Sequence, residues 1–281
     1  MTESRTGTRA QQHEIAIDAS VEAVWKAITD GEELTRWFVE AAKVEPGVGG
    51  SFRISWDSTV PEDASSKIEV WEPNQKLRVA LAPMDMGPAK SDPPTRIIEE
   101  YTIERRDGKT VLRLVESGVP NTPEWDGFYD GTNSGWKQFF RTLRHYLEHH
   151  AGQPRAVIKV VGKLPGSPDQ GWTKLTGPSG LGFEPVAGKS FSTKLASGDT
   201  LSGDVVAVAK PGLVELTVRE YGDAYFAHAM SGAGDSGFVY SMLSVFGKGA
   251  AEVEAIRAKW EAWMTGVLGV EAVPDGTSAS C

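Results

Sequence analysis

One amphipathic segment occurs twice in this sequence, and it constrains the fold more than any other feature. Within residues 131–150, apolar side chains between positions 136 and 147 recur at intervals of three and four residues, which predicts an α-helix with one apolar stripe about three to four turns long. A second stripe with similar spacing lies between residues 250 and 268. Each of these helices closes a series of strand-like segments. The sequence therefore predicts two units of similar architecture.

Segments that precede the two helices repeat as well. Residues 170–176 resemble residues 23–29, and residues 187–191 resemble residues 48–52. An ordered set of repeated segments indicates an internal duplication, of which the second copy is the shorter. The expected division of the chain is a first domain at residues 13–150, a shortened second domain at residues 155–268, and flexible tails at residues 1–12 and 271–281.

Composition excludes several classes of protein. With 281 residues, of which 40% are hydrophobic and 24% charged, the chain is long enough for two ordinary cores. Its net charge of -9 gives no basic excess for binding nucleic acid or an anionic membrane surface. The single cysteine, Cys281, is the last residue, which excludes an internal disulfide. No signal peptide and no run of ~18 apolar residues is present, so we expect a soluble cytoplasmic protein.

The patterns within the first domain follow a clear order. A strand at residues 14–18 precedes two short helices, for which Ser20 and Asp30 are the expected N-caps. Asp107 and Gly108 tolerate positive φ and predict a two-residue hairpin turn. Further strands are expected at residues 52–56, 67–71, 77–81, 96–104 and 110–116, and loops at residues 84–94 and 124–131. This order predicts an α+β domain in which a curved antiparallel sheet wraps around a long C-terminal helix.

Five ordered segments of the first domain resemble one known family: IAIDASVEAVWKAITDGEELTRWF, GGSFRI, IEVWEPNQKLRV, EEYTIERRDGKTVLRLVESGVP and GTNSGWKQFFRTLRHYL. They are similar to the SRPBCC superfamily (START/Bet v1-like), in the branch named after the activator of Hsp90 ATPase. The resemblance spans residues 13–150 and is weaker over residues 155–268. It implies two helix-grip domains, each with a deep apolar cavity that binds or transforms hydrophobic small molecules. Members of the superfamily include lipid carriers, polyketide aromatase/cyclases and proteins of enediyne producers.

Two motifs that can mark metal or nucleotide sites occur in contexts that argue against such sites. His145, Glu148 and His149 match the H-x-x-E-H pattern of zinc proteases, but their position near a helix C-terminus favours solvent-exposed cations. Residues 232–237 match G-x-G-x-x-G, but the repeat places them in a turn between strands, whereas this motif binds pyrophosphate where it opens a helix. We therefore expect no metal and no cofactor.

Aromatic and methionine side chains of the first domain are the candidates for ligand binding. Aromatic stripes ordinarily fill a core, but indole rings also suit the walls of a ligand cavity, and methionine adds adaptable surface. The shorter second domain has fewer residues with which to enclose a ligand, so we expect the main site in the first. The candidate ligand-binding residues are Trp37, Phe38, Trp56, Trp71, Met84, Met86, Tyr101, Trp125, Phe128, Tyr129, Trp136 and Phe140.

Three side chains are candidates for acid or base chemistry: Glu99, Tyr101 and His228. If Glu99 shares the inward face of its strand with Tyr101, its carboxyl group is buried and has a raised pKa. His228 is either a core histidine or a base, and the core role is the more common one.

Three functions remain open from the sequence. We expect a monomer that binds a hydrophobic small molecule such as a polyketide, a polyene or a polycyclic natural product. The first alternative is an enzyme, either a polyketide aromatase/cyclase or a hydrolase that works without metal. The second is a co-chaperone module of the Hsp90 type, which is disfavoured because the eukaryotic activator has a separate domain ahead of its helix-grip unit, whereas this unit begins by residue 13.

Overall fold

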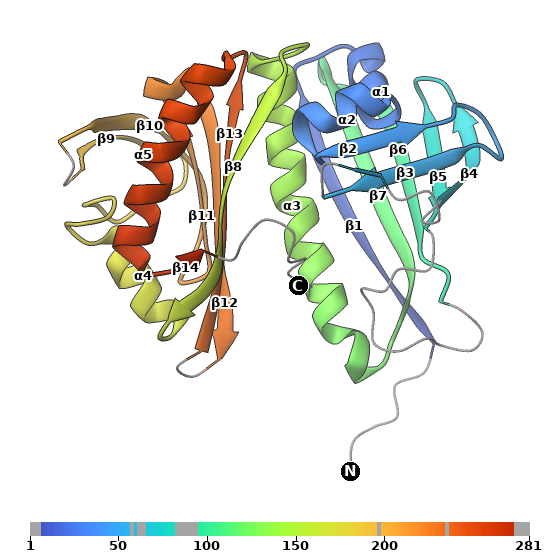
Figure 1. The fold of residues 1–281 in the computed structure, drawn as a ribbon. Helices are drawn as coiled ribbons and strands as arrows, with labels where there is room; N and C mark the ends of the chain where they lie inside the picture. Colours follow the sequence, from blue (N-terminus) through green and yellow to red (C-terminus); the bar gives the residue numbers. More distant parts are fainter. Residues whose placement is uncertain are drawn as a thin grey trace. The chain divides into compact units, whose positions relative to one another are not determined.

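The computed structural model describes residues 7–56, 59–60, 66–81, 95–195, 198–233 and 236–272. Within these residues the chain divides into two compact units, the first ending at Gly152 and the second beginning at Gln153. Each unit combines an antiparallel seven-stranded sheet with several helices, one of which is long (Figure 1). The predicted α+β architecture of two helix-grip domains is confirmed.

In the first unit, one long strand and two short helices come before the remaining strands and the long helix. The helices are α1 (Val21–Thr29), α2 (Gly31–Trp37) and α3 (Asp126–His149), with a 3-10 turn, η1, at Pro123–Trp125. The strands are β1 (Thr8–Ile17), β2 (Ala41–Val44), β3 (Ser51–Ser55), β4 (Ser66–Glu72), β5 (Lys76–Ala80), β6 (Ile98–Arg106) and β7 (Lys109–Pro120). Their order in the sheet is β1-β7-β6-β5-β4-β3-β2, so the first strand lies at an edge beside the last.

Local signals in the first unit behave as the sequence predicts. The hydroxyl oxygen of Ser20 accepts the N–H of Ala23 (3.1 Å), and a carboxylate oxygen of Asp30 accepts the N–H of Glu33 (3.0 Å), so both residues cap their helices. Asp107 and Gly108 both have positive φ, 52° and 78°, and join β6 to β7.

The expected N-terminal tail at residues 1–12 is wrong in its last part, because β1 begins at Thr8. Thr8 pairs with Pro120 at the far end of β7, and the pairing continues along β1 to Ile17. The unusual length of β7 gives these early residues backbone partners. Polar side chains at Gln11 and His13 hide the strand from a search for apolar alternation, yet both are buried.

The expected loop at residues 124–131 is also wrong, because η1 and the first turns of α3 occupy it. Gly127 and Gly131 are poor helix formers, so tertiary contacts stabilise this end of the helix. Asp126 pairs with Arg9 (2.6 Å), and the hydroxyl of Tyr129 donates to a backbone carbonyl oxygen of β1 (3.0 Å). The helix consequently begins at Asp126, five residues before the start that the sequence predicts.

The second unit repeats this arrangement with fewer helices. Its helices are α4 (Pro168–Thr176) and α5 (Ala250–Leu268), with a 3-10 turn, η2, at Arg219–Tyr221. Its strands are β8 (Arg155–Pro165), β9 (Ser190–Lys194), β10 (Thr200–Ala209), β11 (Leu213–Val218), β12 (Ala224–Ala233), β13 (Ser236–Phe246) and β14 (Glu271–Ala272). The order is β14-β8-β13-β12-β11-β10-β9. Because β14 pairs with β8, the expected tail at residues 271–281 begins with a strand.

Candidate functional site

A row of buried polar side chains crosses three strands of the first sheet. The strand register places Gln11 of β1 opposite Glu116 of β7, and Glu116 opposite Glu99 of β6. Residues opposite one another in an antiparallel sheet lie on the same face, so the three side chains are neighbours. Their exposed fractions are 7%, 1% and 9%. We call these three residues the polar row; in β5 the residue opposite Glu99 is the apolar Val79.

Glu116, in the middle of the polar row, is connected to α3. One of its carboxylate oxygens accepts hydrogen bonds from Nε2 of Gln11 (2.6 Å) and from the hydroxyl of Thr132 (2.9 Å). The other faces the indole N–H of Trp136 at 3.4 Å. Nε2 of Gln11 also donates to the hydroxyl oxygen of Thr132 (2.6 Å). The polar row therefore lies beneath the N-terminal half of α3.

Glu99 has a protonation equilibrium unlike that of a surface carboxylate. Burial, followed by the nearby charge of Glu116, raises the pKa of Glu99 to about 8, although the hydrogen bond from the hydroxyl of Tyr101 (2.7 Å) acts in the opposite direction. Burial also raises the pKa of Tyr101 well above its ordinary value. Among the described residues neither Glu99 nor Glu116 has a Lys or Arg in an ion pair. Glu99 is consequently an uncharged carboxylic acid at neutral pH.

Two side chains of β1 have unsatisfied polar atoms at this site. Oε1 of Gln11 and Nε2 of His13 are buried and have no hydrogen-bond partner within the described part of the chain. The ring of His13 contacts that of Phe140 edge to face, with centroids 6.4 Å apart. Burial, with a smaller effect from the charge of Lys137, lowers the pKa of His13 below its ordinary value. His13 is therefore a neutral group with one free ring nitrogen.

Aromatic rings border the polar row. The ring of Phe38, at the end of α2, lies 5.4 Å from that of Trp136, 4.9 Å from that of Phe139 and 5.1 Å from that of Trp56. Trp136 also contacts Tyr101 edge to face at 6.0 Å, and so joins these rings to the polar row. We call these five residues the aromatic cluster. Phe140 extends it toward His13, because its ring lies 5.9 Å from that of Trp136.

The structure brings only part of the predicted ligand-binding set together. Trp37, Phe38, Trp56, Tyr101, Trp136 and Phe140 lie in or beside the aromatic cluster. Trp71 instead contacts Trp25 of α1. Trp125 contacts Phe128 at the start of α3, and Tyr129 packs against the guanidinium group of Arg9 (4.4 Å). Met84 and Met86 lie outside the described residues.

Four residues of the site are not among the candidates predicted from the sequence: Gln11, His13, Glu116 and Thr132. Gln11 and His13 were placed in the expected tail or just beyond it, and Thr132 at the helix start. A weak signal for them did exist: the alternation of Ile15 and Ile17, continued backwards two residues at a time, reaches His13 and Gln11, and the burial of β1 alternates in this way. For Glu116, two residues beyond Leu114 on β7, the same alternation places it on the inward face.

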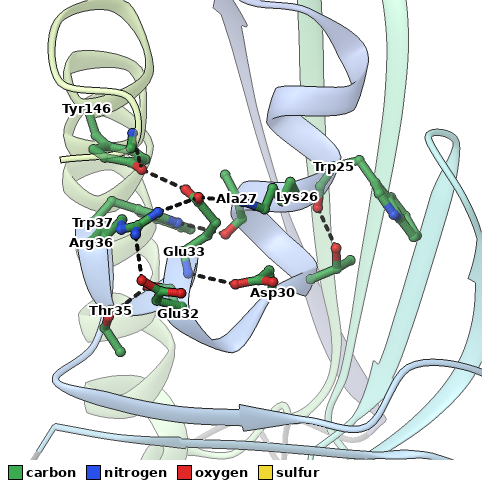
Figure 2. A network of polar contacts seen from close by, with 12 residues as sticks. Trp25, Lys26, Ala27, Asp30, Glu32, Glu33, Thr35, Arg36, Trp37 and Tyr146 are labelled. Carbon is green, nitrogen blue, oxygen red and sulfur yellow. Dashed lines mark hydrogen bonds and ion pairs between the residues drawn. The ribbon is translucent and has the colours of Figure 1, made fainter. Parts of the chain in front are cut away.

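A third buried carboxylate of the first unit, Glu33 of α2, has an opposite environment (Figure 2). One oxygen accepts from Nζ of Lys26 (3.0 Å) and Nη1 of Arg36 (2.6 Å), and the other accepts from the hydroxyl of Tyr146 (2.6 Å). Burial alone would raise the pKa of Glu33, but these three partners bring it below its ordinary value. The Tyr146 oxygen also accepts the N–H of Gly152 (2.9 Å). Glu33 thus fixes α2, with the adjoining Phe38, against α3.

The third catalytic candidate, His228, lies in the core of the second unit. Its Nδ1 is 2.5 Å from the hydroxyl oxygen of Ser241, and its ring stacks on Phe226 at 5.9 Å. Burial lowers the pKa of His228 to about 3, so the ring is neutral at physiological pH. Tyr225 and Glu215 form another buried pair in this unit, in which the tyrosine hydroxyl donates to the carboxylate.

The two motifs set aside in the sequence have ordinary structural roles. Glu148 accepts the backbone N–H of Asp18 (2.9 Å). His145 was expected to be exposed but is buried, with its ring 5.0 Å from that of His149. No group of three or more His, Cys, Asp or Glu side chains among the described residues could hold a metal ion. The G-x-G-x-x-G segment joins β12 to β13, as the repeat predicts.

No helix in the described ranges is both long enough and apolar enough to cross a bilayer.

Comparisons with solved structures find chains that are similar to one unit and others that are similar over nearly the whole length. A protein from Mesorhizobium loti is 28% identical over 50% of this chain and 98% of its own, with a TM-score of 0.42. BexL, a di-domain ARO/CYC protein from the BE-7585A biosynthetic pathway, is 13% identical over 95% of this chain and 100% of its own, with a TM-score of 0.43. DynU16, from the dynemicin biosynthetic locus, is 18% identical over 92% and 96%, with a TM-score of 0.39.

Sequence comparison assigns the first unit more directly. No curated protein matches the chain. Residues 18–148 match the family described as "Activator of Hsp90 ATPase homolog 1-like protein". This range runs from the end of β1 to the end of α3 and includes Glu99, Glu116 and Trp136. The first unit of this chain is therefore an AHSA1-like domain of the SRPBCC superfamily.

Proposed function

We propose that the first unit binds a hydrophobic, ring-containing small molecule, such as a polyketide or another polycyclic natural product, between its sheet and the N-terminal half of α3. The observation that supports this proposal is the polar row of Gln11, Glu116 and Glu99, which is buried beside the aromatic cluster and has no cation in an ion pair among the residues that the structure describes. An apolar wall with a few convergent polar groups is the usual chemistry of a small-molecule site.

The energetics of the polar row favour a binding role over a purely structural one. Burying a polar group without a compensating hydrogen bond is unfavourable, and burying a carboxylate beside a second carboxylate is more so. Apolar side chains at Gln11 and Glu99 would fill the same face of the sheet without this penalty. Glu33 shows how this fold stabilises a buried carboxylate for structure, namely with a lysine, an arginine and a tyrosine. The polar row lacks the two cations.

A molecule of this kind would contact both parts of the site. Phe38, Trp136 and Tyr101 offer ring faces and edges for stacking, and the hydrogen-bonding groups of the polar row orient the ligand. The resemblance of the first unit to the SRPBCC superfamily also implies binding of a hydrophobic small molecule. The aromatic rings and the polar row described above suit such a ligand.

A second candidate function is catalysis, as a cyclase or aromatase. It is favoured by the raised pKa of Glu99, because a carboxylic acid that is still protonated at neutral pH can donate a proton to a bound ketone. A binding protein returns its ligand unchanged, whereas a cyclase releases a product that has lost water or gained a ring. Mass and absorbance spectra of the ligand before and after incubation separate the two functions, because ring formation without loss of water leaves the mass unchanged.

The binding proposal is tested by native mass spectrometry of the full-length protein purified from its own producer. We expect a co-purified small molecule in the wild type. Phe140→Ala, which removes a ring beside Trp136 and His13, should reduce its occupancy, whereas Trp263→Ala on α5 of the second unit should not. Loss of the molecule from Trp263→Ala with retention by Phe140→Ala would place the site in the wrong unit. A wild-type protein that neither co-purifies with nor takes up an aromatic molecule would refute the proposal.

A further inference from the structure

The hydrogen-bonding groups of the site restrict the chemical class of its ligand. Oε1 of Gln11 can only accept a hydrogen bond, and it has no donor within the described residues. The amide cannot resolve this by itself, because its Nε2 already donates to Glu116 and Thr132. A ligand that satisfies Oε1 must therefore present a hydrogen-bond donor at β1.

Glu99 presents the complementary chemistry on the other side of Glu116. Tyr101 donates to one oxygen of Glu99, and the protonated carboxyl group has its own hydrogen to donate. A ligand beside Glu99 is therefore best matched by an oxygen that accepts a hydrogen bond. The polar row itself contains two carboxyl groups and neither lysine nor arginine, so a ligand carboxylate would meet like charge without compensation.

We infer that the ligand of the first unit is an uncharged aromatic molecule with hydroxyl substituents, in which a hydroxyl donates to Oε1 of Gln11 and a ring-bound oxygen accepts from Glu99. Carboxylates such as fatty acids are excluded. This inference rests on the function proposed above for the first unit and adds the ligand class to it.

Binding should depend on pH through Glu99. The titratable groups that act on it are Glu116 on β7 and Tyr101 on its own strand, while β5 presents the apolar Val79. His13 of β1, with the charge of Lys137 nearby, lies in the neighbouring row of the sheet, opposite Leu114. His13 has a lowered pKa and Tyr101 a raised one, so neither changes charge between about pH 7 and 9. A raised pKa means that Glu99 loses its donated hydrogen within this interval. An oxygen acceptor then binds less tightly as pH rises.

Four probes with one ring system test the inference on the full-length protein: 2-naphthol, 2-methoxynaphthalene, naphthalene and 2-naphthoate. At about pH 7 we expect 2-naphthol to bind several-fold more tightly than 2-methoxynaphthalene, because its hydroxyl can either donate to Oε1 of Gln11 or accept from Glu99, whereas the ether can only accept. Naphthalene should bind more weakly than the ether, and 2-naphthoate most weakly of all. Gln11→Leu should reduce the preference for the phenol over the ether to about one.

The pH arm uses 2-methoxynaphthalene, which has no titratable group. Its dissociation constant should rise about tenfold between about pH 6.5 and 9.5 in the wild type, and Glu99→Gln, which retains an N–H donor at every pH, should give a flat profile. Glu215→Gln is the matched control, since it replaces a buried, tyrosine-bonded carboxyl group of the second unit. The dissociation constant of Glu215→Gln for 2-methoxynaphthalene should rise with pH as it does in the wild type.

The outcomes distinguish failure of the ligand class from failure of the proposed binding site. If all four probes bind equally, or if 2-naphthoate binds most tightly, the ligand class is wrong and the proposed hydrophobic site stands. A flat pH profile in the wild type also contradicts the role of Glu99. If none of the four probes binds, both the ligand class and the proposed function are wrong.

Discussion

Replacement of Glu99 by glutamine should stabilise the first unit at alkaline pH. Glu99 is 9% exposed and the pKa of its carboxyl group is raised from 4.5 to about 8, because burial and Glu116 both disfavour the charged form. The folded protein therefore holds a proton between these two values that the unfolded chain has released. By linkage, this group lowers the free energy of unfolding as pH rises from about 4.5 to 8. The amide of glutamine has the same shape, still accepts from Tyr101 and never ionises.

The size of the effect follows from the shift in pKa. Each pKa unit corresponds to about 1.4 kcal/mol, so the free energy of unfolding of Glu99→Gln, relative to that of the wild type, should rise by roughly 4 to 5 kcal/mol between pH 4.5 and 8. At about pH 7 most of this difference, roughly 3 kcal/mol, is already present. This is a large part of the 5–15 kcal/mol by which domains are typically stable, so it should be readily measured.

Glu33→Gln is the matched control, because it makes the same substitution at a carboxylate with a lowered pKa. The stability that Glu33 contributes is present above its ordinary pKa of 4.5 and is lost as pH falls through the folded value. Its replacement leaves Lys26, Arg36 and Tyr146 with a weaker acceptor and should cost about 1–3 kcal/mol at neutral pH. The cost should diminish toward about pH 4.

The assay is urea unfolding of the full-length protein at several values between about pH 5 and 9, with tryptophans labelled by fluorine. The ¹⁹F resonances separate the unfolding of the first unit, which contains Trp136, from that of the second, which contains Trp260. Destabilisation by Glu99→Gln at pH 8 comparable to that by Glu33→Gln would refute the argument, as would a difference from the wild type that does not change with pH.

Three further outcomes are expected from the packing and the backbone. Tyr146→Phe removes both the donor to Glu33 and the acceptor of a backbone N–H, so it should cost about 1–2 kcal/mol in urea unfolding. Gly118→Ala should cost several-fold more than Gly108→Ala: both have positive φ, but a Cβ at Gly118 would lie 2.1 Å from a backbone carbonyl oxygen, whereas none lies within 4 Å at Gly108; equal thermal shifts would contradict this. Trp260→Ala should destabilise the second unit by about 3–5 kcal/mol and Trp263→Ala by less, because Trp263 is only partly buried; the reverse order in urea unfolding would show that the core is described wrongly.

The sequence was sufficient to predict the architecture, because periodicity is a local property. The apolar stripe of α3 and the turn at Asp107 and Gly108 depend on neighbours a few residues away, so both could be predicted without tertiary information. The same holds for the caps at Ser20 and Asp30. The neighbourhood of Glu99 and Tyr101 was likewise suspected from their spacing of two along a strand, and the structure shows that they are hydrogen-bonded.

Boundaries of elements depended on distant partners and were predicted poorly. Residues near Thr8 are in a strand because β7 extends to Pro120, more than a hundred residues later. The first turns of α3 contain two glycines and are stabilised by Arg9 and by the backbone of β1. No local pattern contains these contacts. The polar row escaped sequence analysis for the same reason, since Gln11 and Glu116 become neighbours only when the two strands pair.

Glu33 and Glu99 show most directly what only the tertiary structure decided. Both are buried glutamates of one unit, and their local sequences do not reveal that one has a lowered pKa and the other a raised one. Both side chains are removed from solvent, and the difference lies in what compensates for this: two cations and Tyr146 for Glu33, but only the hydroxyl of Tyr101, with another carboxylate nearby, for Glu99. Sequence determines the charge that each side chain can hold. The three-dimensional arrangement of neighbours determines whether holding it is favourable, because electrostatic energy depends on distance and solvation rather than on separation along the chain.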